Sequence, residues 1–293
     1  MTLDRHDTAS LIRASGLEPL EAAVLAALAL GKPREWLLGH DRDRLDANQV
    51  HALLAVFELR RAGLPVAYLC GEREFHGHSF QVTRDTLIPR PETELLVEAA
   101  IEAAIDRASA PRLPGASPDG LAAGALRILD LGTGSGAVAI SIALALARRL
   151  PAAEVLALER STHALVVARR NAERLGARVE FLAGDWFVPL GGFRFDLIVS
   201  NPPYVAAADP HLAQGDLRYE PPEALTAGVD GLDALRIIIA GALDHLAVQG
   251  RLLLEHGHDQ GAAVRALLVA AGLRSVFTLR DLAGIERVSG GVR

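Results

Sequence analysis

Apolar residues recur at helical spacing in the first part of the chain, which predicts a region built from helices. The first run places its apolar residues on one helical face: Leu17, Leu20, Val24, Leu25 and Leu28. Gly31 and Pro33 are expected to end this helix, because proline cannot continue a helix and glycine accepts the conformation of a helix end. Asp46 with Gln49 resembles a capping box, so a second helix is predicted to begin there and to end before Gly63.

The pattern changes to short alternating segments between 75 and 88, which predicts a β-hairpin, and a segment at 109–124 with Pro, Gly, Ala and Ser is interpreted as a surface loop. Beyond it, strand-like and helix-like segments alternate. The predicted strands are 127–131, 154–159, 178–182, 195–200 and 251–255. A helix is predicted after the first strand, ending at 149, and further helices are predicted at 162–175, 232–248 and 260–271. Such alternation predicts an α/β fold, with a doubly wound, mostly parallel, Rossmann-like sheet covered by helices on both faces.

Three parts of the chain are therefore expected. Residues 1–72 form a small all-helical domain, 73–90 a β-hairpin linker, and 91–293 the α/β domain. Pro91 lies near the first position of the helix that opens the last part, where proline is well tolerated.

Composition narrows the class of protein. The chain has 293 residues, of which 50% are hydrophobic, and no run approaches the roughly 18 uncharged apolar residues of a membrane helix. The N-terminus lacks the basic start and apolar core of a secretory signal, so a cytoplasmic protein without membrane contact is expected. The single cysteine, Cys70, excludes an internal disulfide. The net charge of −6 argues against a surface dedicated to nucleic acid.

A glycine-rich turn follows the strand at 127–131. Its sequence, DLGTGSG at 130–136, places glycines where the backbone must approach a ligand and a helix N-terminus follows, which indicates a nucleotide-like ligand. The G-x-G-x-G spacing differs from the G-x-G-x-x-G of dinucleotide folds. The next strand ends in Glu159, whose carboxylate can accept from both hydroxyls of a ribose, although a solvated strand end is the simpler interpretation.

The following strand ends in Gly184, Asp185 and Trp186, which suit a purine. Asp185 can accept from an exocyclic amine, and Trp186 can cover the face of the ring. Packing in the core is the alternative interpretation of Trp186.

The segment Asn201-Pro202-Pro203-Tyr204, after the strand at 195–200, has a geometry suited to methylation of a planar nitrogen. The Asn201 side chain and the main-chain carbonyl of Pro202 offer two acceptors for the two N–H groups of an amide or amine. Pro202 and Pro203 stiffen the backbone, and Tyr204 can lie against the planar group. The alternative is a proline pair that only stops a strand.

These motifs in this order resemble an S-adenosylmethionine-dependent class I methyltransferase. Further segments, GEREF at 71–75 with Gly77 and Phe80, LIPRPETE at 87–94, and the tetrapeptide, are similar to the PrmC (HemK) family over nearly the whole chain. The resemblance implies transfer of a methyl group from S-adenosylmethionine to the side-chain nitrogen (N5) of the glutamine in the Gly-Gly-Gln motif of class 1 peptide-chain release factors. It also implies direct in-line transfer without a covalent enzyme intermediate, and 1–72 as the substrate-docking domain.

The resemblance also implies roles for residues. The cofactor would contact the glycine-rich turn, two acidic strand ends, an aromatic ring and the tetrapeptide: Gly132, Thr133, Gly134, Ser135, Gly136, Glu159, Asp185, Trp186 and Asn201. The family more often has aspartate where this chain has Glu159. The substrate glutamine would contact Asn201, Pro202, Pro203 and Tyr204, with Asn201, Pro202 and Tyr204 as the catalytic residues.

Three alternatives remain open on sequence. An adenine-N6 DNA methyltransferase faces the same geometric problem, but the small helical domain is not notably basic. A glutamine methyltransferase acting on a ribosomal protein shares the tetrapeptide, and a protein that only senses the cofactor would need the glycine turn but not Asn201.

Two histidine pairs, at 76 and 78 and at 256 and 258, raise the question of a metal. Neither pair has a cysteine or third histidine nearby, whereas such sites need three or four ligands, so no metal is expected. Arg90 and Glu92 either line a substrate entrance or cap the next helix.

Overall fold

The computed structural model describes residues 7–110 and 125–293, so most of the loop expected at 109–124 lies outside the described residues. The chain folds as two compact units. One contains Met1–Glu72 together with His211–Tyr219, and the other contains Arg73–Pro210 together with Glu220–Arg293. Each unit is described by itself below.

The N-terminal unit is helical, as predicted. Its helices are α1 (Thr8–Ala14), α2 (Pro19–Leu30), α3 (Arg34–His40), α4 (Ala47–Arg61) and α5 (Val66–Cys70). Helix α2 ends at Gly31 in the left-handed conformation, and the capping box of Asp46 and Gln49 opens α4 with both of its hydrogen bonds, so both sequence predictions are confirmed. Leu25 and Phe57 are fully buried in a core shared by α2 and α4.

A distant segment of the chain completes this unit. Residues His211–Tyr219 contain most of the short 3-10 helix η3 (Pro210–Ala213) and all of η4 (Leu217–Tyr219). Arg60 donates from Nε to Glu21 at 2.8 Å and from Nη1 to Asp216 at 2.7 Å, and the hydroxyl of Tyr219 donates to the carbonyl of Ala62 at 2.6 Å. The segment is therefore fixed to α4 by hydrogen bonds and an ion pair.

A two-stranded hairpin of β1 (Glu72–Phe75) and β2 (His78–Gln81) forms as predicted, and all of it except Glu72 belongs to the second unit. Phe75 and Phe80 bury the hairpin against the core of the unit. Asn171 fixes its far strand: the side chain accepts from the backbone N–H of Gln81 at 2.7 Å and donates to the carbonyls of Gln81 and Ser135. The hairpin is thus tied to the glycine-rich turn.

Within the described residues the main sheet has seven strands, in the order β5-β4-β3-β6-β7-β9-β8. The strands are β3 (Arg127–Leu131), β4 (Glu154–Glu159), β5 (Glu180–Ala183), β6 (Phe195–Ser200), β7 (Leu246–Glu255), β8 (Arg274–Arg280) and β9 (Glu286–Val292). Strands β3 to β7 run parallel, and β9 pairs antiparallel with β7 and with β8. The predicted mostly parallel, doubly wound sheet is confirmed.

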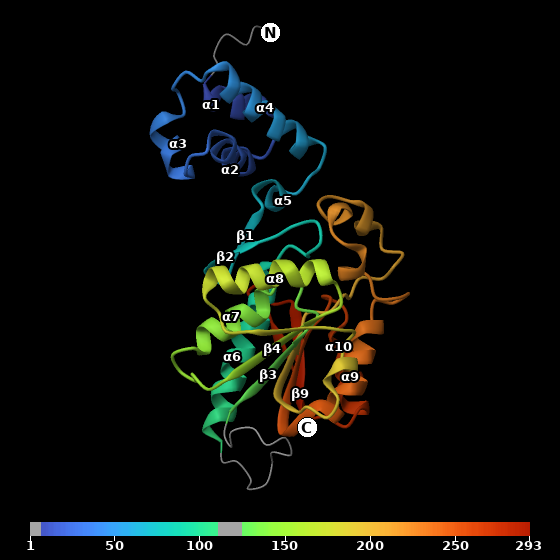
Figure 1. Ribbon diagram of the computed structural model, residues 1–293. Helices are drawn as coiled ribbons and strands as arrows, with labels where there is room; N and C mark the ends of the chain where they lie inside the picture. Colours follow the sequence, from blue (N-terminus) through green and yellow to red (C-terminus); the bar gives the residue numbers. More distant parts are fainter. Residues whose placement is uncertain (1–6, 111–124) are drawn as a thin grey trace. The chain divides into compact units, whose positions relative to one another are not determined.

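Helices cover both faces of the sheet (Figure 1). The helices of this unit are α6 (Glu94–Ser109), α7 (Ala137–Leu146), α8 (Thr162–Leu175), α9 (Asp233–His245) and α10 (Gly261–Ala270), and the 3-10 turn η1 (Pro91–Thr93) precedes α6. The first three helices pack in one apolar cluster and α9 with α10 in another, on opposite sides of the strands. No helix of the described residues is long and apolar enough to cross a membrane.

The structure corrects the sequence prediction near the C-terminus. Helix α9 ends at His245, and residues predicted to continue it begin β7 instead, because Leu246 pairs with Phe195 of β6. Strands β8 and β9 were not predicted. The side chains of β8 are mostly half-buried and β9 contains adjacent glycines at 290 and 291, so neither strand shows clear apolar alternation.

The capping box gives a stability prediction for the helical unit. Asp46→Ala removes the side-chain acceptor for the backbone N–H of Gln49 and should lower the free energy of unfolding by about 1 kcal/mol. Thermal and urea unfolding followed by circular dichroism measure this. The exposed Asp43 serves as control, since Asp43→Ala should change stability by less than about 0.5 kcal/mol. Equal effects of the two substitutions would contradict a role for the cap.

Candidate active site

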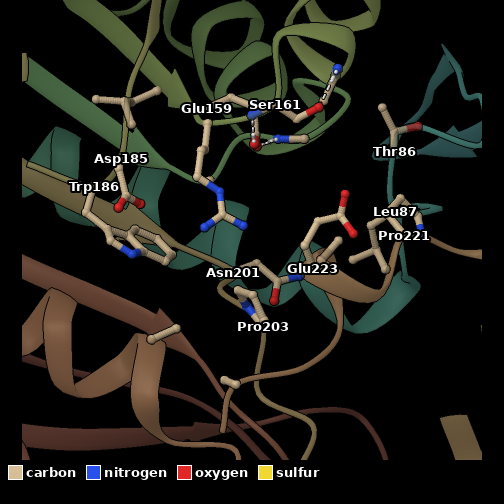
Figure 2. Close-up of a pocket in the computed structure, with 18 of the residues that line it drawn as sticks. Thr86, Leu87, Glu159, Ser161, Asp185, Trp186, Asn201, Pro203, Pro221 and Glu223 are labelled. Carbon is tan, nitrogen blue, oxygen red and sulfur yellow. Dashed lines mark hydrogen bonds between the residues drawn. The ribbon is translucent and has the colours of Figure 1, made fainter. Parts of the chain in front are cut away.

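The parallel strands end at one edge of the sheet, and the predicted site residues lie there. Leu131 of β3 pairs with Leu158 of β4 and with Ser200 of β6, and Ser200 pairs with Leu254 of β7. A cavity of about 600 Å³ opens at this edge (Figure 2). Ligand sites of open α/β sheets lie in this position, beyond the carboxyl ends of the strands.

The glycine-rich turn forms one wall of the cavity. The backbone N–H groups of Gly132 and Thr133 donate to the carbonyl of Leu158, and Gly132 and Gly134, both with positive φ, line the cavity. Gly136 also has a positive φ of 84°, and a Cβ there would lie 2.7 Å from Ile140. The turn therefore needs glycine for conformation and for close packing.

Buried Asp130 supports this turn from beneath. Its Oδ2 accepts from the hydroxyl of Thr133 at 2.6 Å and from the backbone N–H of Ala139 at 3.2 Å. Burial raises the pKa of its carboxyl to about 7, and the charge of Glu159 adds to this, while the hydrogen bonds from Thr133 and Ala139 oppose it. Asp130 thus fixes the turn to the start of α7.

Glu159 lies on the cavity wall with its carboxylate held by backbone donors. Oε2 accepts from the N–H of Gly134 at 2.9 Å, and Oε1 accepts from the N–H of Ser161 at 2.8 Å (Figure 2). Each carboxylate oxygen can accept more than one hydrogen bond, so Glu159 keeps capacity for a ligand hydroxyl. The side chain is positioned by the turn, and is not a loosely solvated strand end.

Asp185 and Trp186 follow β5 and line the cavity beside this wall. Asp185 is exposed, whereas Trp186 is half-buried and packs against the apolar cluster beneath α9. Trp186 has a positive φ of 45°, which is unusual for a bulky residue and turns the chain sharply. A Cβ at Gly132 would lie 3.7 Å from the Trp186 ring, so the ring lies close to the glycine-rich turn. Trp186 therefore both packs against the apolar cluster and lines the cavity, and its role toward a purine stays a prediction.

The tetrapeptide enters the cavity directly after β6. Asn201 and Pro203 line the cavity, and the side-chain nitrogen Nδ2 of Asn201 donates to Oγ1 of Thr93 at 3.0 Å. The amide group is therefore turned so that its donor is engaged and its acceptor Oδ1 remains for a ligand. The hydroxyl of Ser200, just before it, donates to the carbonyl of Leu131 at 2.6 Å and fixes the end of the strand.

Tyr204, which was expected to lie against the planar group of a substrate, lies behind the cavity wall and does not line the cavity. Its ring packs against the apolar cluster under α9 and α10, its hydroxyl donates to Oε1 of Glu255 at 3.2 Å, and its carbonyl accepts from Gln260 at 3.0 Å. Burial raises the pKa of its hydroxyl, and the neighbouring Glu255 carboxyl adds to this. Tyr204 holds the tetrapeptide in place from behind.

Not every predicted residue lines the cavity. Among the described residues the lining includes six of the predicted cofactor residues, namely Gly132, Gly134, Glu159, Asp185, Trp186 and Asn201. The remaining predicted residues lie beside it or beneath it: Thr133, Ser135, Gly136, Pro202 and Tyr204. Thr133 and Ser135 are nearly fully buried, so their side chains shape the turn.

The opposite wall comes from two segments that sequence reasoning did not assign. Thr86 and Leu87, after the hairpin, lie beside Pro221 and Glu223, on the other side of the cavity from Asp185 and Trp186 (Figure 2). Buried Glu220 joins the two segments, because its carboxylate accepts from the N–H of Ile88 at 3.0 Å and from the guanidinium of Arg90. Arg90 therefore supports the wall of the site.

The histidine pairs give no metal site in the part of the chain that the structure describes, where no cluster of three or more candidate ligands occurs. His256 is fully buried, and its Nε2 lies 2.9 Å from the hydroxyl of Ser289. Burial lowers the pKa of its imidazole. His256 is thus a hydrogen-bonded core residue.

Comparisons with known proteins match this architecture part by part. The family model of the PrmC N-terminal domain matches residues 5–71, and that of the methyltransferase small domain matches residues 117–217. A release factor glutamine methyltransferase from Bordetella pertussis is 52% identical over 96% of this chain and 97% of the relative. The chain belongs to the release factor glutamine methyltransferase family.

Other relatives agree with this assignment. The release factor glutamine methyltransferase of Burkholderia pseudomallei is 51% identical over 97% of this chain and 95% of that protein. Among solved structures, the catalytic domain of hMettl16 in complex with the MAT2A 3'UTR hairpin 1 is similar with a TM-score of 0.52 at 15% identity, over 92% of this chain and 93% of that chain. This structural likeness shows the fold alone.

Buried Asp130 gives a pH prediction. A carboxyl whose pKa is raised on folding favours the folded state only while it is protonated, so stability falls as pH rises from the unfolded pKa near 4 to about 7. Asp130→Asn removes this ionisation. Between pH 4 and pH 8 the free energy of unfolding of the variant, relative to the unmodified protein, should increase by a few kcal/mol, at about 1.4 kcal/mol per pKa unit. Urea unfolding at both pH values measures it, and a pH-independent difference would contradict the prediction.

Proposed function

We propose that this protein transfers a methyl group from S-adenosylmethionine to the side-chain amide nitrogen of the glutamine in the Gly-Gly-Gln motif of class 1 peptide-chain release factors. The observation that carries the proposal is the orientation of Asn201. Its amide donor is engaged by Thr93, which leaves the acceptor oxygen for an amide N–H at the cavity. The names of the relatives, matched over nearly the full length of the chain, supply the substrate class.

The residues of the cavity fit S-adenosylmethionine. Gly132 and Gly134 line the cavity and would contact the methionine part, and a side chain at either position would be strained at positive φ. Glu159 would hold the ribose hydroxyls, and Asp185 with Trp186 the adenine, as carboxylate and aromatic face suit these groups. When bound, the cofactor supplies the transferable methyl group, which is carried on its sulfonium. The protein supplies binding and orientation.

The tetrapeptide would hold the glutamine amide. Oδ1 of Asn201 and the carbonyl of Pro202 accept from the two N–H groups, which immobilises the nitrogen and favours electron density on it as it attacks. Pro202 is buried and Pro203 lines the cavity, so the backbone there is stiff by sequence and by packing. We propose that Tyr204 contributes by fixing this backbone.

The helical unit is proposed to dock the release factor. Several large apolar side chains on its helices are exposed, among them Leu20, Leu38 and Leu59. Together with the absence of a basic surplus in the sequence, this favours a protein partner over direct contact with nucleic acid.

We propose a cytoplasmic location, where release factors act, and a reaction without a metal.

The experiment that tests the function is mass spectrometry of a release factor incubated with this protein and S-adenosylmethionine. One added methyl group on the Gly-Gly-Gln glutamine is expected, and a release factor with that glutamine replaced by alanine should remain unmodified. Methylation of a ribosomal protein or of adenine in DNA, tested with the same preparation, would instead support the two alternative substrate classes.

The role of Asn201 gives a prediction for turnover. Asn201→Ala removes the side-chain acceptor and should lower the rate of methylation by about 100-fold or more, while the affinity for S-adenosylmethionine changes by less than about threefold. Single-turnover kinetics and isothermal titration calorimetry measure the two quantities. A parallel loss of cofactor affinity and rate would assign Asn201 to cofactor binding instead.

A further inference from the structure

A network of buried and half-buried polar side chains connects Asn201 to Glu255 at the end of β7. Asn201 Nδ2 donates to Thr93 Oγ1 at 3.0 Å, and the Tyr204 hydroxyl donates to Glu255 Oε1 at 3.2 Å. The hydroxyl of Thr93 lies near enough to the carboxyl of Glu255 to act on it, and lowers its pKa. Thr93 is 4% exposed and Glu255 is 1% exposed, so water does not supply alternative partners. The network therefore has few ways to arrange its protons.

The ionised carboxylate fixes the direction of each hydrogen bond in this network. A carboxylate only accepts, so the hydroxyls of Thr93 and Tyr204 both donate to it. The one proton of the Thr93 hydroxyl is then used, and its oxygen can only accept from Asn201. The amide group of Asn201 must present its nitrogen to Thr93, which leaves Oδ1 as an acceptor for the substrate.

We propose that Glu255 and Thr93 are positioning residues, which set the orientation of the Asn201 amide so that its oxygen receives the amide nitrogen of the substrate glutamine. This inference rests on the proposed function. Sheet register supports it: Ser200 pairs with Leu254, so Asn201 and Glu255 follow adjacent positions at the same edge of the sheet. Neither Glu255 nor Thr93 lines the cavity, so each acts through Asn201 or Tyr204.

The carboxyl of Glu255 changes its protonation state near neutral pH. Burial raises the pKa of its carboxyl to about 7, the hydrogen bonds from Thr93 and Tyr204 and the charge of Arg287 oppose this, and Glu92 adds to it. Oε2 has no hydrogen-bond partner among the described residues, in accord with the cost of burying the charge. The charge of Arg90 also acts on the network, because it works to lower the pKa of the Tyr204 hydroxyl.

Protonation would loosen the orientation of Asn201. A protonated Glu255 can donate to Thr93, and the Thr93 hydroxyl can then donate to Asn201. The Asn201 amide is then hydrogen-bonded equally well when it is flipped, with Oδ1 toward Thr93 and the nitrogen toward the cavity. The flipped amide presents N–H groups to a substrate that also presents N–H groups, and turnover should fall. The rate is therefore expected to decrease as pH falls through about 7.

Substitutions at Thr93 test the positioning role. Thr93→Val keeps the shape and removes the hydroxyl, and kcat should fall between about 10-fold and about 100-fold, because the acceptor is no longer held in place. Thr93→Ser keeps the hydroxyl and should recover most of the rate. KM for the release factor and affinity for S-adenosylmethionine should remain within about threefold of the unmodified protein in both. Equal rates for the two variants would overturn the proposal.

The pH profile of kcat tests Glu255 directly. The unmodified protein should show a loss of rate on the acid side, with a midpoint near 7, and Glu255→Gln should lower the rate and abolish this pH dependence. Asp130→Asn is the necessary comparison, because Asp130 also has a pKa of about 7 in the folded protein. The acid limb should persist in Asp130→Asn. An acid limb retained in Glu255→Gln would overturn the proposal.

A measurement without substrate separates this inference from the proposed function. In ¹⁵N-labelled protein, the side-chain amide signal of Asn201, assigned by its loss in Asn201→Asp, should shift with pH around 7. The shift should be absent in Glu255→Gln, whose cofactor affinity and thermal unfolding show that it is folded. A pH-coupled signal in a protein that leaves release factors unmodified would reject the function and keep the network. If the protein methylates release factors but the Asn201 signal does not change with pH, the inference about the network is wrong and the proposed function stands.

Discussion

The alignment of strand ends in the parallel sheet is the constraint on which the site depends. Parallel pairing from β5 through β7 brings the carboxyl ends of these strands to one edge, so residues far apart in sequence meet there. Glycine at 132 and 134 admits a ligand to the edge, and Asp130 beneath the turn keeps it in shape. A shift of one residue in any pairing would turn these side chains to the wrong face of the sheet.

Much of this arrangement follows from local sequence. The strand at Phe195–Ser200 was predicted with its observed bounds. Glu159, Asp185 and Asn201 were recognised because each lies at or just after the end of a strand in an alternating pattern. The start of β7 was predicted wrongly, because pairing with β6 overrides the helical propensity of residues after His245. Local patterns therefore identify where strands end better than where they begin.

The second layer of the site could not be obtained in this way. Thr93 was noticed only as part of a motif, and its contact with Asn201 joins residues more than a hundred positions apart. Glu255 carries a weak sequence signal, a carboxylate at the end of the apolar run Leu252–Leu254, but its partners depend on the register of β6 and β7. Such relations arise from tertiary structure and have no local pattern.

The segment His211–Tyr219 has a consequence for how such proteins can diverge. It leaves the α/β unit shortly after the tetrapeptide, folds with the helical unit through Arg60 and Ala62, and returns to the α/β unit at Glu220. The helical unit is thus discontinuous in sequence. Recombination at the single boundary near Glu72 would part Arg60 from Asp216, so exchange of this unit between relatives requires two coordinated pieces of the gene. The helical unit and the loop beyond the tetrapeptide are therefore expected to be inherited together.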